Sequence, residues 1–211
     1  MNRIIVAGCG GHARSVIDAI LSAGIYEIAG FVDREINEEY VYRSYKIIGT
    51  DADLPMIYAS GIHNACIGIG YMGEGTVRRK LFDSLKQSGF DLPPIADRTA
   101  AVAGDALLGE GAFVGKNSVV NAASVIGNAA IINSGAIVEH DCKVGDFAHI
   151  AVGAVLCGNV EIGDDVLVGA NATVIQGLRI GSAAVVGAGA VVTKNIGAGI
   201  KAAGVPAHTL K

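Results

Sequence analysis

Residues 125–166 read VIGNAA IINSGA IVEHDC KVGDFA HIAVGA VLCGNV EIGDDV when the chain is divided into groups of six. The second residue of every group is Ile, Val or Leu, and this register continues in both directions without a slip. It comprises sixteen aliphatic residues: Val102, Leu108, Val114, Val120, Ile126, Ile132, Val138, Val144, Ile150, Leu156, Ile162, Val168, Val174, Ile180, Val186 and Val192. A small residue follows four positions later in most groups, from Ala106 to Ala154. This period of six predicts a parallel β-helix built from hexapeptide repeats.

Each group supplies one short strand and one corner, so three groups close a triangular coil of 18 residues. Residues 18 apart then stack about 4.8 Å apart along the axis. Sixteen groups give slightly more than five coils around a column of aliphatic side chains. The general rule for parallel crossovers predicts a right-handed coil, whereas nothing in the spacing itself decides the hand.

The first part of the chain follows a different pattern, in which strand-like and helix-like stretches alternate. A strand at Arg3–Ala7 runs into the glycine turn Gly8–Ala13 and a helix at Arg14–Ala23, and a second strand, Glu27–Val32, ends at Asp33. This order of strand, glycine turn, helix, strand and acid is typical of a Rossmann-like unit. The glycines would let backbone N–H groups approach a phosphate at the helix N-terminus, and Asp33 would hold a ribose hydroxyl. The alternative is a βα turn that is merely tight.

Further elements complete this unit. We expect a helix at Ala52–Ala59, a third strand at Ala65–Gly70 whose glycines permit close approach of a ligand, and a helix at Glu74–Ser88. The basic run Arg78–Lys80 is interpreted as a solvated helix face. About 90 residues make half a dinucleotide fold, with room for one nucleotide rather than NAD. Two prolines after Leu92 mark the predicted boundary between domains 1–93 and 94–211.

Composition excludes several classes of protein. The 211 residues are 51% hydrophobic with a formal net charge of −4, so the chain is neither disordered nor basic enough for a nucleic-acid-binding protein. No apolar stretch is long enough to predict a membrane span, and Met1–Ala7 shows no signal-peptide pattern. The four cysteines lack C-x-x-C spacing, so we expect free thiols in a reducing cytoplasm.

One group interrupts the hexapeptide pattern with chemistry-bearing residues. Glu139 replaces the frequent glycine, and His140 lies between it and Asp141. A histidine hydrogen-bonded to a carboxylate is fixed in one tautomer and made more basic, as a general base requires. The competing interpretation is a water-exposed corner. His140, His149 and Cys157 have no established spacing for a metal site, so we expect no metal.

Motifs along the whole chain resemble one family. They are Gly8-Cys9-Gly10-Gly11-His12-Ala13, Asp33, Ile67-Gly68-Ile69-Gly70, Asn133, Glu139-His140-Asp141-Cys142, His149, Gly158-Asn159 and Gly204-Val205-Pro206-Ala207. The chain resembles the sugar acetyltransferases of the bacillosamine-pathway and sialic-acid O-acetyltransferase type, which are PglD/NeuD-like. The resemblance implies a Rossmann-like half-domain that binds a nucleotide sugar, followed by a left-handed parallel β-helix of about five coils that binds acetyl-CoA and carries the catalytic residues. It also implies a homotrimer.

The resemblance further implies roles for individual residues. His140 matches the general base, and Asp141 matches its acidic partner, although the bacillosamine enzymes have Glu there. The matches to acetyl-CoA contacts are His149, Gly158 (as a donor to the oxyanion), Ala170 and Ala188. The matches to nucleotide-sugar contacts are Gly10, Gly11, His12, Asp33, Arg34 and Gly70, with Asn133 near the sugar.

These features predict a cytoplasmic acetyltransferase that transfers acetyl directly from acetyl-CoA to a nucleotide-linked amino sugar of the UDP-4-amino-sugar type. Three alternatives remain open: O-acetylation of sialic acid or a related sugar, a NAD-type oxidoreductase or sensor module that uses the glycine turn, and a non-catalytic trimeric module that binds a nucleotide. The truncated nucleotide unit disfavours NAD, and the intact His140–Asp141 pair argues against a scaffold.

Overall fold

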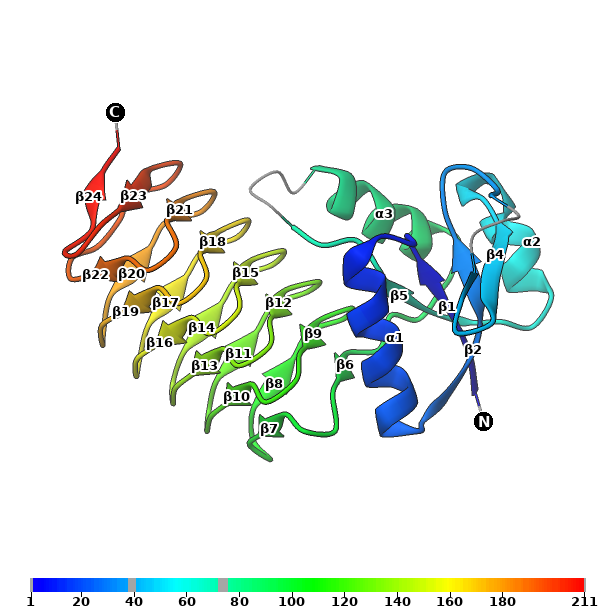
Figure 1. Cartoon of the computed structure of the whole chain (residues 1–211), viewed down its shortest axis with the longest axis horizontal. Helices are drawn as coiled ribbons and strands as arrows, with labels where there is room; N and C mark the ends of the chain where they lie inside the picture. The colour runs from blue at the N-terminus through cyan, green and yellow to red at the C-terminus, as the bar shows by residue number, and fades with distance from the viewer. Residues whose placement is uncertain (1, 38–40, 72–75, 211) are drawn as a thin grey trace.

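The protein consists of an α/β front domain and a long triangular prism of short parallel strands (Figure 1). We describe it from a computed structural model, which describes residues 2–37, 41–71 and 76–210. In Figure 1 the front domain lies on the right, and the prism extends to the left and ends near the C-terminus.

The front domain is one sheet with helices beside it. Its elements are β1 (Asn2–Ala7), α1 (Gly11–Ala23), β2 (Tyr26–Val32), β3 (Val41–Tyr42), β4 (Tyr45–Gly49), the 3₁₀ helix η1 (Asp51–Asp53), α2 (Leu54–Ala59), β5 (Asn64–Ile67) and α3 (Thr76–Gln87). The strand order is β3-β4-β2-β1-β5. β1, β2, β4 and β5 are parallel, and β3 pairs antiparallel with β4.

The predicted strand–turn–helix–strand order is confirmed, with shifted ends. α1 begins at Gly11, three residues before the predicted start. β5 ends at Ile67 instead of Gly70. Gly68 follows it where the glycine turn passes so closely that a Cβ at Gly68 would collide with the Gly8 carbonyl oxygen. The β3–β4 hairpin was not predicted. The predicted start of the last helix, Glu74 and Gly75, lies outside the described residues.

The prism has three faces, each a stack of parallel strands. The first face contains β6 (Ile95–Ala96), β9 (Phe113–Val114), β12 (Ile131–Ile132), β15 (His149–Ile150), β18 (Leu167–Val168), β21 (Val185–Val186), β23 (Lys201–Ala203) and the antiparallel β24 (His208–Thr209). The second face contains β7 (Ala101–Val102), β10 (Val119–Val120), β13 (Ile137–Val138), β16 (Val155–Leu156), β19 (Thr173–Val174) and β22 (Val191–Val192). The third face contains β8 (Leu107–Leu108), β11 (Val125–Ile126), β14 (Lys143–Val144), β17 (Glu161–Ile162) and β20 (Arg179–Ile180).

The hexapeptide prediction is confirmed. Strands pair with a shift of 18 residues, as between Val120 and Val138, and each of the sixteen aliphatic residues is the second residue of its strand. Most of them form one buried column with the small residues, such as Ala148 and Cys142. The coil is left-handed. The general rule for parallel crossovers is wrong here, because two-residue strands are too short to impose the twist on which that rule depends.

Left-handed backbone marks the corners of the prism. Every sixth residue from Gly111 to Gly189 has a positive φ, including Asp141 (60°) and Asn159 (57°). Glycine, asparagine and aspartate adopt this conformation at the lowest cost. The chemistry-bearing group at 139–142 is therefore a corner between the second and third faces.

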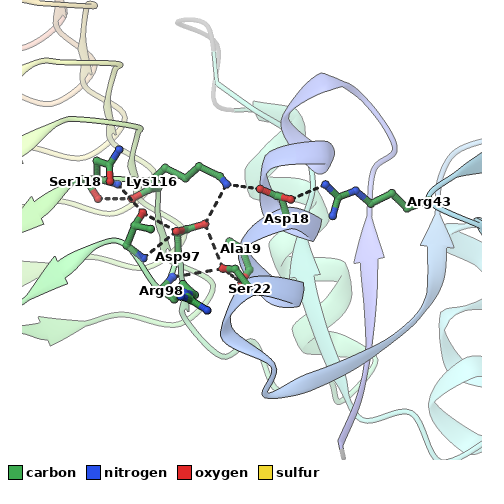
Figure 2. A network of polar contacts seen from close by, with 11 residues as sticks. Asp18, Ala19, Ser22, Arg43, Asp97, Arg98, Lys116 and Ser118 are labelled. Carbon is green, nitrogen blue, oxygen red and sulfur yellow. Dashed lines mark hydrogen bonds and ion pairs between the residues drawn. The ribbon is translucent and has the colours of Figure 1, made fainter.

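The front domain is fixed on the first face. Phe113 and Ile131, which point outward from that face, are buried in a core shared with α1 and the sheet. Beside this core, Ser22 Oγ of α1 donates to Oδ2 of the buried Asp97 (3.3 Å). Lys116 of the prism pairs with Asp18 of α1 and, at 3.9 Å, with Asp97; both pairs are drawn in Figure 2.

The prediction of a solvated face at Arg78 and Arg79 is wrong. Arg78 is only 1% exposed. Its Nε donates to the carbonyl of Ala129 on the prism (3.0 Å), and its Nη1 donates to the carbonyl of Ile69. Arg79 lies 3.9 Å over the Phe147 ring and pairs with Asp165 (2.6 Å). The reason is tertiary: α3 packs against a corner of the prism, which the sequence pattern of the helix does not reveal.

Candidate active site

The glycine turn forms one wall of a pocket at the edge of the front sheet. The strand order reverses between β1 and β5, and ligands of open α/β sheets bind at the carboxyl ends of the strands at such a point. The pocket there has a volume of about 320 Å³. Its lining includes residues 8–12, Asp33, Arg34 and residues 68–70, so the structure brings together all the predicted nucleotide-sugar residues except Asn133.

The start of α1 supplies N–H donors to this pocket. Gly10 is the N-cap residue and has no side-chain cap, and no acidic residue lies in the first turn. The first N–H groups of a helix have no partner within the helix, and the helix dipole favours an anion there. A Cβ added at Gly10 or Gly11 would meet no atom within 4 Å. The glycines therefore leave open space where a phosphate would lie.

Asp33 braces the glycine turn. Its Oδ2 accepts the Cys9 N–H (2.8 Å), and its Oδ1 accepts the Arg34 N–H (2.7 Å). Burial tends to raise the pKa of Asp33, but the hydrogen bonds from Cys9 and Arg34 outweigh it, so its pKa lies below the ordinary value. Asp33 is therefore a carboxylate at neutral pH, with lone pairs left for a ribose hydroxyl.

His12 is an uncharged part of the pocket wall. Its ring meets Phe113 edge-on, with 5.0 Å between the centroids. Burial, followed by the charges of Arg78 and His149, lowers the pKa of His12 to about 3. Its Nε2 is buried and has no hydrogen-bond partner among the described residues.

Asn133 and His149 lie together on the prism, where Tyr71 of the front domain contacts it. His149 is 7% exposed, and its Nδ1 lies 2.7 Å from the carbonyl oxygen of Tyr71. Its Nε2 lies 3.1 Å from Asn133 Nδ2, while Asn133 Oδ1 accepts the Ser134 N–H (2.8 Å). This arrangement fits a histidine whose Nδ1–H donates to Tyr71 and whose Nε2 accepts from Asn133. Burial is the main cause that lowers the pKa of His149, which favours this neutral form.

His140 lies at a different corner, between the second and third faces. Its Nδ1 is 2.8 Å from Asp141 Oδ2. This hydrogen bond is the main cause that raises the pKa of His140 above its ordinary value. With Nδ1–H donated to Asp141, Nε2 is left as the acceptor that a general base needs.

Gly158 lies beside the His140 ring, one coil further along the prism. A Cβ at Gly158 would lie 2.6 Å from His140 Nε2, so only glycine leaves room for the ring. The Gly158 N–H has no acceptor among the described residues. His140 and Gly158 line a pocket of about 350 Å³ with Asn159, Gln176 and Gly177. Sequence reasoning missed Gln176. It lies 18 residues after Gly158, and residues separated by one coil of 18 stack on each other, so the spacing could have identified it.

The predicted acetyl-CoA residues are separated: His149 lies in β15 of the first face, and the others are divided between two corners. Ala170 and Ala188 follow β18 and β21, at the corner between the first and second faces that also carries Asn133. His140 and Gly158 lie at the corner between the second and third faces. One chain therefore does not bring all the predicted catalytic and acetyl-CoA residues into one pocket.

Comparisons with known proteins agree with this architecture. The family model of the PglD N-terminal domain matches residues 3–85, and that of the hexapeptide repeat of succinyl-transferase matches residues 159–194. No match was found among curated protein sequences. Among solved structures, a variant of GDP-perosamine N-acetyltransferase from Caulobacter crescentus in complex with CoA and GDP-perosamine is 33% identical, with a TM-score of 0.93. The match covers 100% of this chain and 98% of that one.

The chain belongs to the PglD-like family of sugar acetyltransferases. The acetyltransferase domain of PglB from Neisseria gonorrhoeae, solved with acetyl coenzyme A, is also similar. It is 31% identical, with a TM-score of 0.90 and full coverage of both chains. In this PglD-like acetyltransferase, no described group of three or more His, Cys, Asp or Glu side chains could hold a metal ion. None of the described helices is long and apolar enough to cross a membrane.

Proposed function

We propose that the protein transfers the acetyl group of acetyl-CoA to the amine of a nucleotide-linked amino sugar, with His140 as general base. The observation that carries this proposal is the pairing of His140 Nδ1 with Asp141 at 2.8 Å, which leaves Nε2 free beside the unpaired Gly158 N–H. The similar enzyme solved with CoA and GDP-perosamine supports this pair of substrates.

The proposed reaction is a direct transfer. As the sugar amine attacks the thioester carbonyl, His140 Nε2 takes a proton from the amine nitrogen, and Asp141 stabilises the imidazolium. The Gly158 N–H donates to the oxyanion of the tetrahedral intermediate. When the C–S bond breaks, the imidazolium returns its proton to the leaving sulfur, so that coenzyme A departs as a thiol.

Assembly follows from where the two sites lie. Asn133, the predicted sugar contact, lies at one corner of the second face, whereas His140 lies across that face at the next corner. We infer that a sugar held by one copy is acetylated at His140 of a neighbouring copy. The outward residues of the second face are mostly aliphatic: Ala101, Val119, Ile137, Val155, Thr173 and Val191. Head-to-tail contacts close into a ring when the rotation between copies permits it, and for this three-faced prism we propose a homotrimer.

We place the enzyme in the cytoplasm. All four cysteines are free thiols, which suits a reducing compartment. A nucleotide-activated sugar and acetyl-CoA are both products of cytoplasmic metabolism.

The test of this function is the His140→Ala variant. We expect kcat to fall about 100-fold or more, because positioned general bases contribute about 10²–10⁴-fold. Release of the CoA thiol with a nucleotide amino sugar measures the rate, and calorimetric titration checks that acetyl-CoA affinity changes little. His63→Ala, at an exposed histidine of the front domain, is the control and should retain activity. Near-normal turnover by His140→Ala would rule out the proposed mechanism.

A further inference from the structure

A second cavity opens beside the glycine-turn pocket. Its volume is about 400 Å³, and it shares Gly8, Asp33, Arg34, Ile69 and Val77 with that pocket. The two cavities are therefore continuous. A nucleotide with its phosphates at the start of α1 and its ribose at Asp33 would extend its base into the second cavity. This inference rests on the proposed function.

The walls of the cavity suit a flat aromatic ring. Val32 at the end of β2 contributes an apolar surface, as do Ile69 after β5 and Val77 and Leu81 on α3. Lys80 and Ser84 of the same helix also line the cavity. Residues spaced by three, four and seven positions share one helix face, so α3 presents a combined apolar and polar surface to the base.

Two opposite charges in the cavity have no protein partner. Asp51, the first residue of η1, faces the cavity together with Lys80. Its neighbour Asp53 is occupied as a helix cap, with Oδ2 accepting from Thr50 N (2.8 Å) and Thr50 Oγ1 (2.9 Å). Among the described residues, neither the Asp51 carboxylate nor the Lys80 ammonium has a hydrogen-bond or ion-pair partner. Both charges are therefore available to a ligand.

We propose that this cavity binds the base of the sugar nucleotide and selects guanine. Guanine offers the N1–H and N2–H₂ donors on one edge, which a carboxylate accepts together, and the O6 and N7 acceptors, which an ammonium reaches. The Asp51 carboxylate accepts hydrogen bonds from N1–H and N2–H₂, and the Lys80 ammonium donates to O6 and N7. The cavity thus favours a guanosine diphosphate sugar over the uridine nucleotide expected from the sequence.

Other bases satisfy this arrangement less well. Adenine has an N6–H₂ donor in place of O6, so only N7 would remain for Lys80. Its N1 is an acceptor and would face the Asp51 carboxylate without a hydrogen bond. Uracil has one ring-nitrogen donor between two carbonyl groups and no exocyclic amine. Its single ring would also leave part of the apolar walls uncovered. Hypoxanthine keeps O6 and N1–H and lacks only the N2 amine, which makes it a direct probe of Asp51.

The experiment is calorimetric titration of the full chain with GDP, IDP, ADP and UDP. We expect GDP to bind about tenfold or more better than UDP or ADP. We expect GDP to bind at least about fivefold better than IDP. Asp51→Asn should weaken GDP binding about tenfold and reduce the ratio of the GDP and IDP affinities toward one. Lys80→Met should weaken GDP and IDP equally and leave that ratio unchanged.

Asp83→Asn is the matched control, because Asp83 is an exposed carboxylate of α3 outside the cavity lining. It should leave the Kd of GDP unchanged. Tighter binding of UDP or ADP than of GDP would overturn the guanine assignment, as would a GDP-to-IDP ratio unaffected by Asp51→Asn. Either result leaves the acetyltransferase function standing. Absence of binding to every nucleotide, with no CoA release from any nucleotide amino sugar, would instead refute the proposed function as well.

Discussion

The His140–Asp141 pair is built from two consecutive residues. This is possible because Asp141 occupies the left-handed position of its corner, with φ of 60°. There a short carboxylate turns back to the preceding imidazole and meets Nδ1 at 2.8 Å. By resemblance, the bacillosamine enzymes have a longer Glu at this position. At an αL corner, Asp is the less costly choice, since its short side chain tolerates that conformation.

This pair predicts how the rate depends on pH. The pKa of His140 is raised, chiefly by the hydrogen bond with Asp141, so the imidazole is protonated below that pKa and cannot act as a base. We expect kcat/KM to fall with decreasing pH through an inflection above the ordinary histidine value of about 6.5. In Asp141→Asn, the inflection should move to lower pH, and the plateau should fall at least about tenfold, because the tautomer is no longer held. Unchanged pH–rate profiles in the variant would show that Asp141 does not set the basicity of His140.

At the scale of elements, the turn between β1 and α1 has open space on its ligand side. Gly8 needs its positive φ of 94°, but Gly10 has ordinary backbone angles, and a Cβ at Gly10 would meet no atom within 4 Å. Glycine at position 10 is therefore not required by the fold. The space it leaves lies where the unpaired N–H groups of α1 emerge, which points to a ligand.

Gly10→Val should fill this space without disturbing the fold. We expect the affinity for the sugar nucleotide to fall about tenfold or more, because the valine side chain occupies the phosphate position. Acetyl-CoA binding and the unfolding temperature should change little. Separate calorimetric titrations with each ligand measure the two effects. If acetyl-CoA binding is lost while sugar-nucleotide binding survives, the two sites are assigned in reverse.

Helix α3 connects the front domain to the prism through Arg78. Its planar guanidinium bridges the carbonyls of Ile69, beside the glycine-turn pocket, and Ala129, on the prism. Burial lowers the pKa of Arg78 to about 10, so the side chain stays charged at neutral pH. The fork geometry of arginine explains why one side chain holds both partners.

Arg78→Lys should therefore destabilise the protein. A single ammonium cannot serve both carbonyls in the geometry of the guanidinium, and a buried acceptor left unpaired costs about 1–3 kcal/mol. We expect a loss of this size in the free energy of unfolding, measured by chemical denaturation. Arg79→Lys provides the comparison. Its ion pair with Asp165 is partly exposed, so we expect a change of at most about 1 kcal/mol. Equal effects of the two variants would contradict the bridging role of Arg78.

At the scale of the whole molecule, the three faces of the prism have different surfaces. The first is covered by the front domain in its early coils, as at Phe113 and Ile131. The third carries charged outward residues in its later coils, at Lys143, Glu161 and Arg179. The second is mostly aliphatic and separates the corner with Asn133 from the corner with His140. This face is the one suited to contact with another copy.

A charge on the second face should break the assembly. We expect Ile137→Asp to convert a trimer of three 21.4 kDa chains into monomers, because burying an unpaired carboxylate in an aliphatic interface is costly. Light scattering after size-exclusion chromatography measures the mass, and activity should be lost together with the trimer. Met56→Asp, at an exposed position of the front domain, should leave the mass unchanged. A wild-type monomer with full activity would contradict the proposed assembly.

The sequence by itself determined the prism and the nucleotide-binding unit. The period of six is local and strict, since each coil must bury one aliphatic residue per strand, so the inward residues could be read directly from Val102 to Val192. The glycine turn was equally local. The interruption of the hexapeptide pattern at Glu139–Asp141 also identified His140 and Asp141, which the structure joins by a hydrogen bond.

Only the tertiary structure decided what depends on packing between distant segments. The docking of the front domain buries Arg78 and brings Tyr71 onto His149, across 78 residues of sequence. Within the front domain, the fold also brings Asp51 of η1 and Lys80 of α3 to the lining of one cavity, and Lys80 is exposed there, as predicted. The contacts of Arg78 and of His149 arise between surfaces of the front domain and the prism whose sequence patterns are independent of each other. No spacing within either segment encodes which residues of the other it will meet.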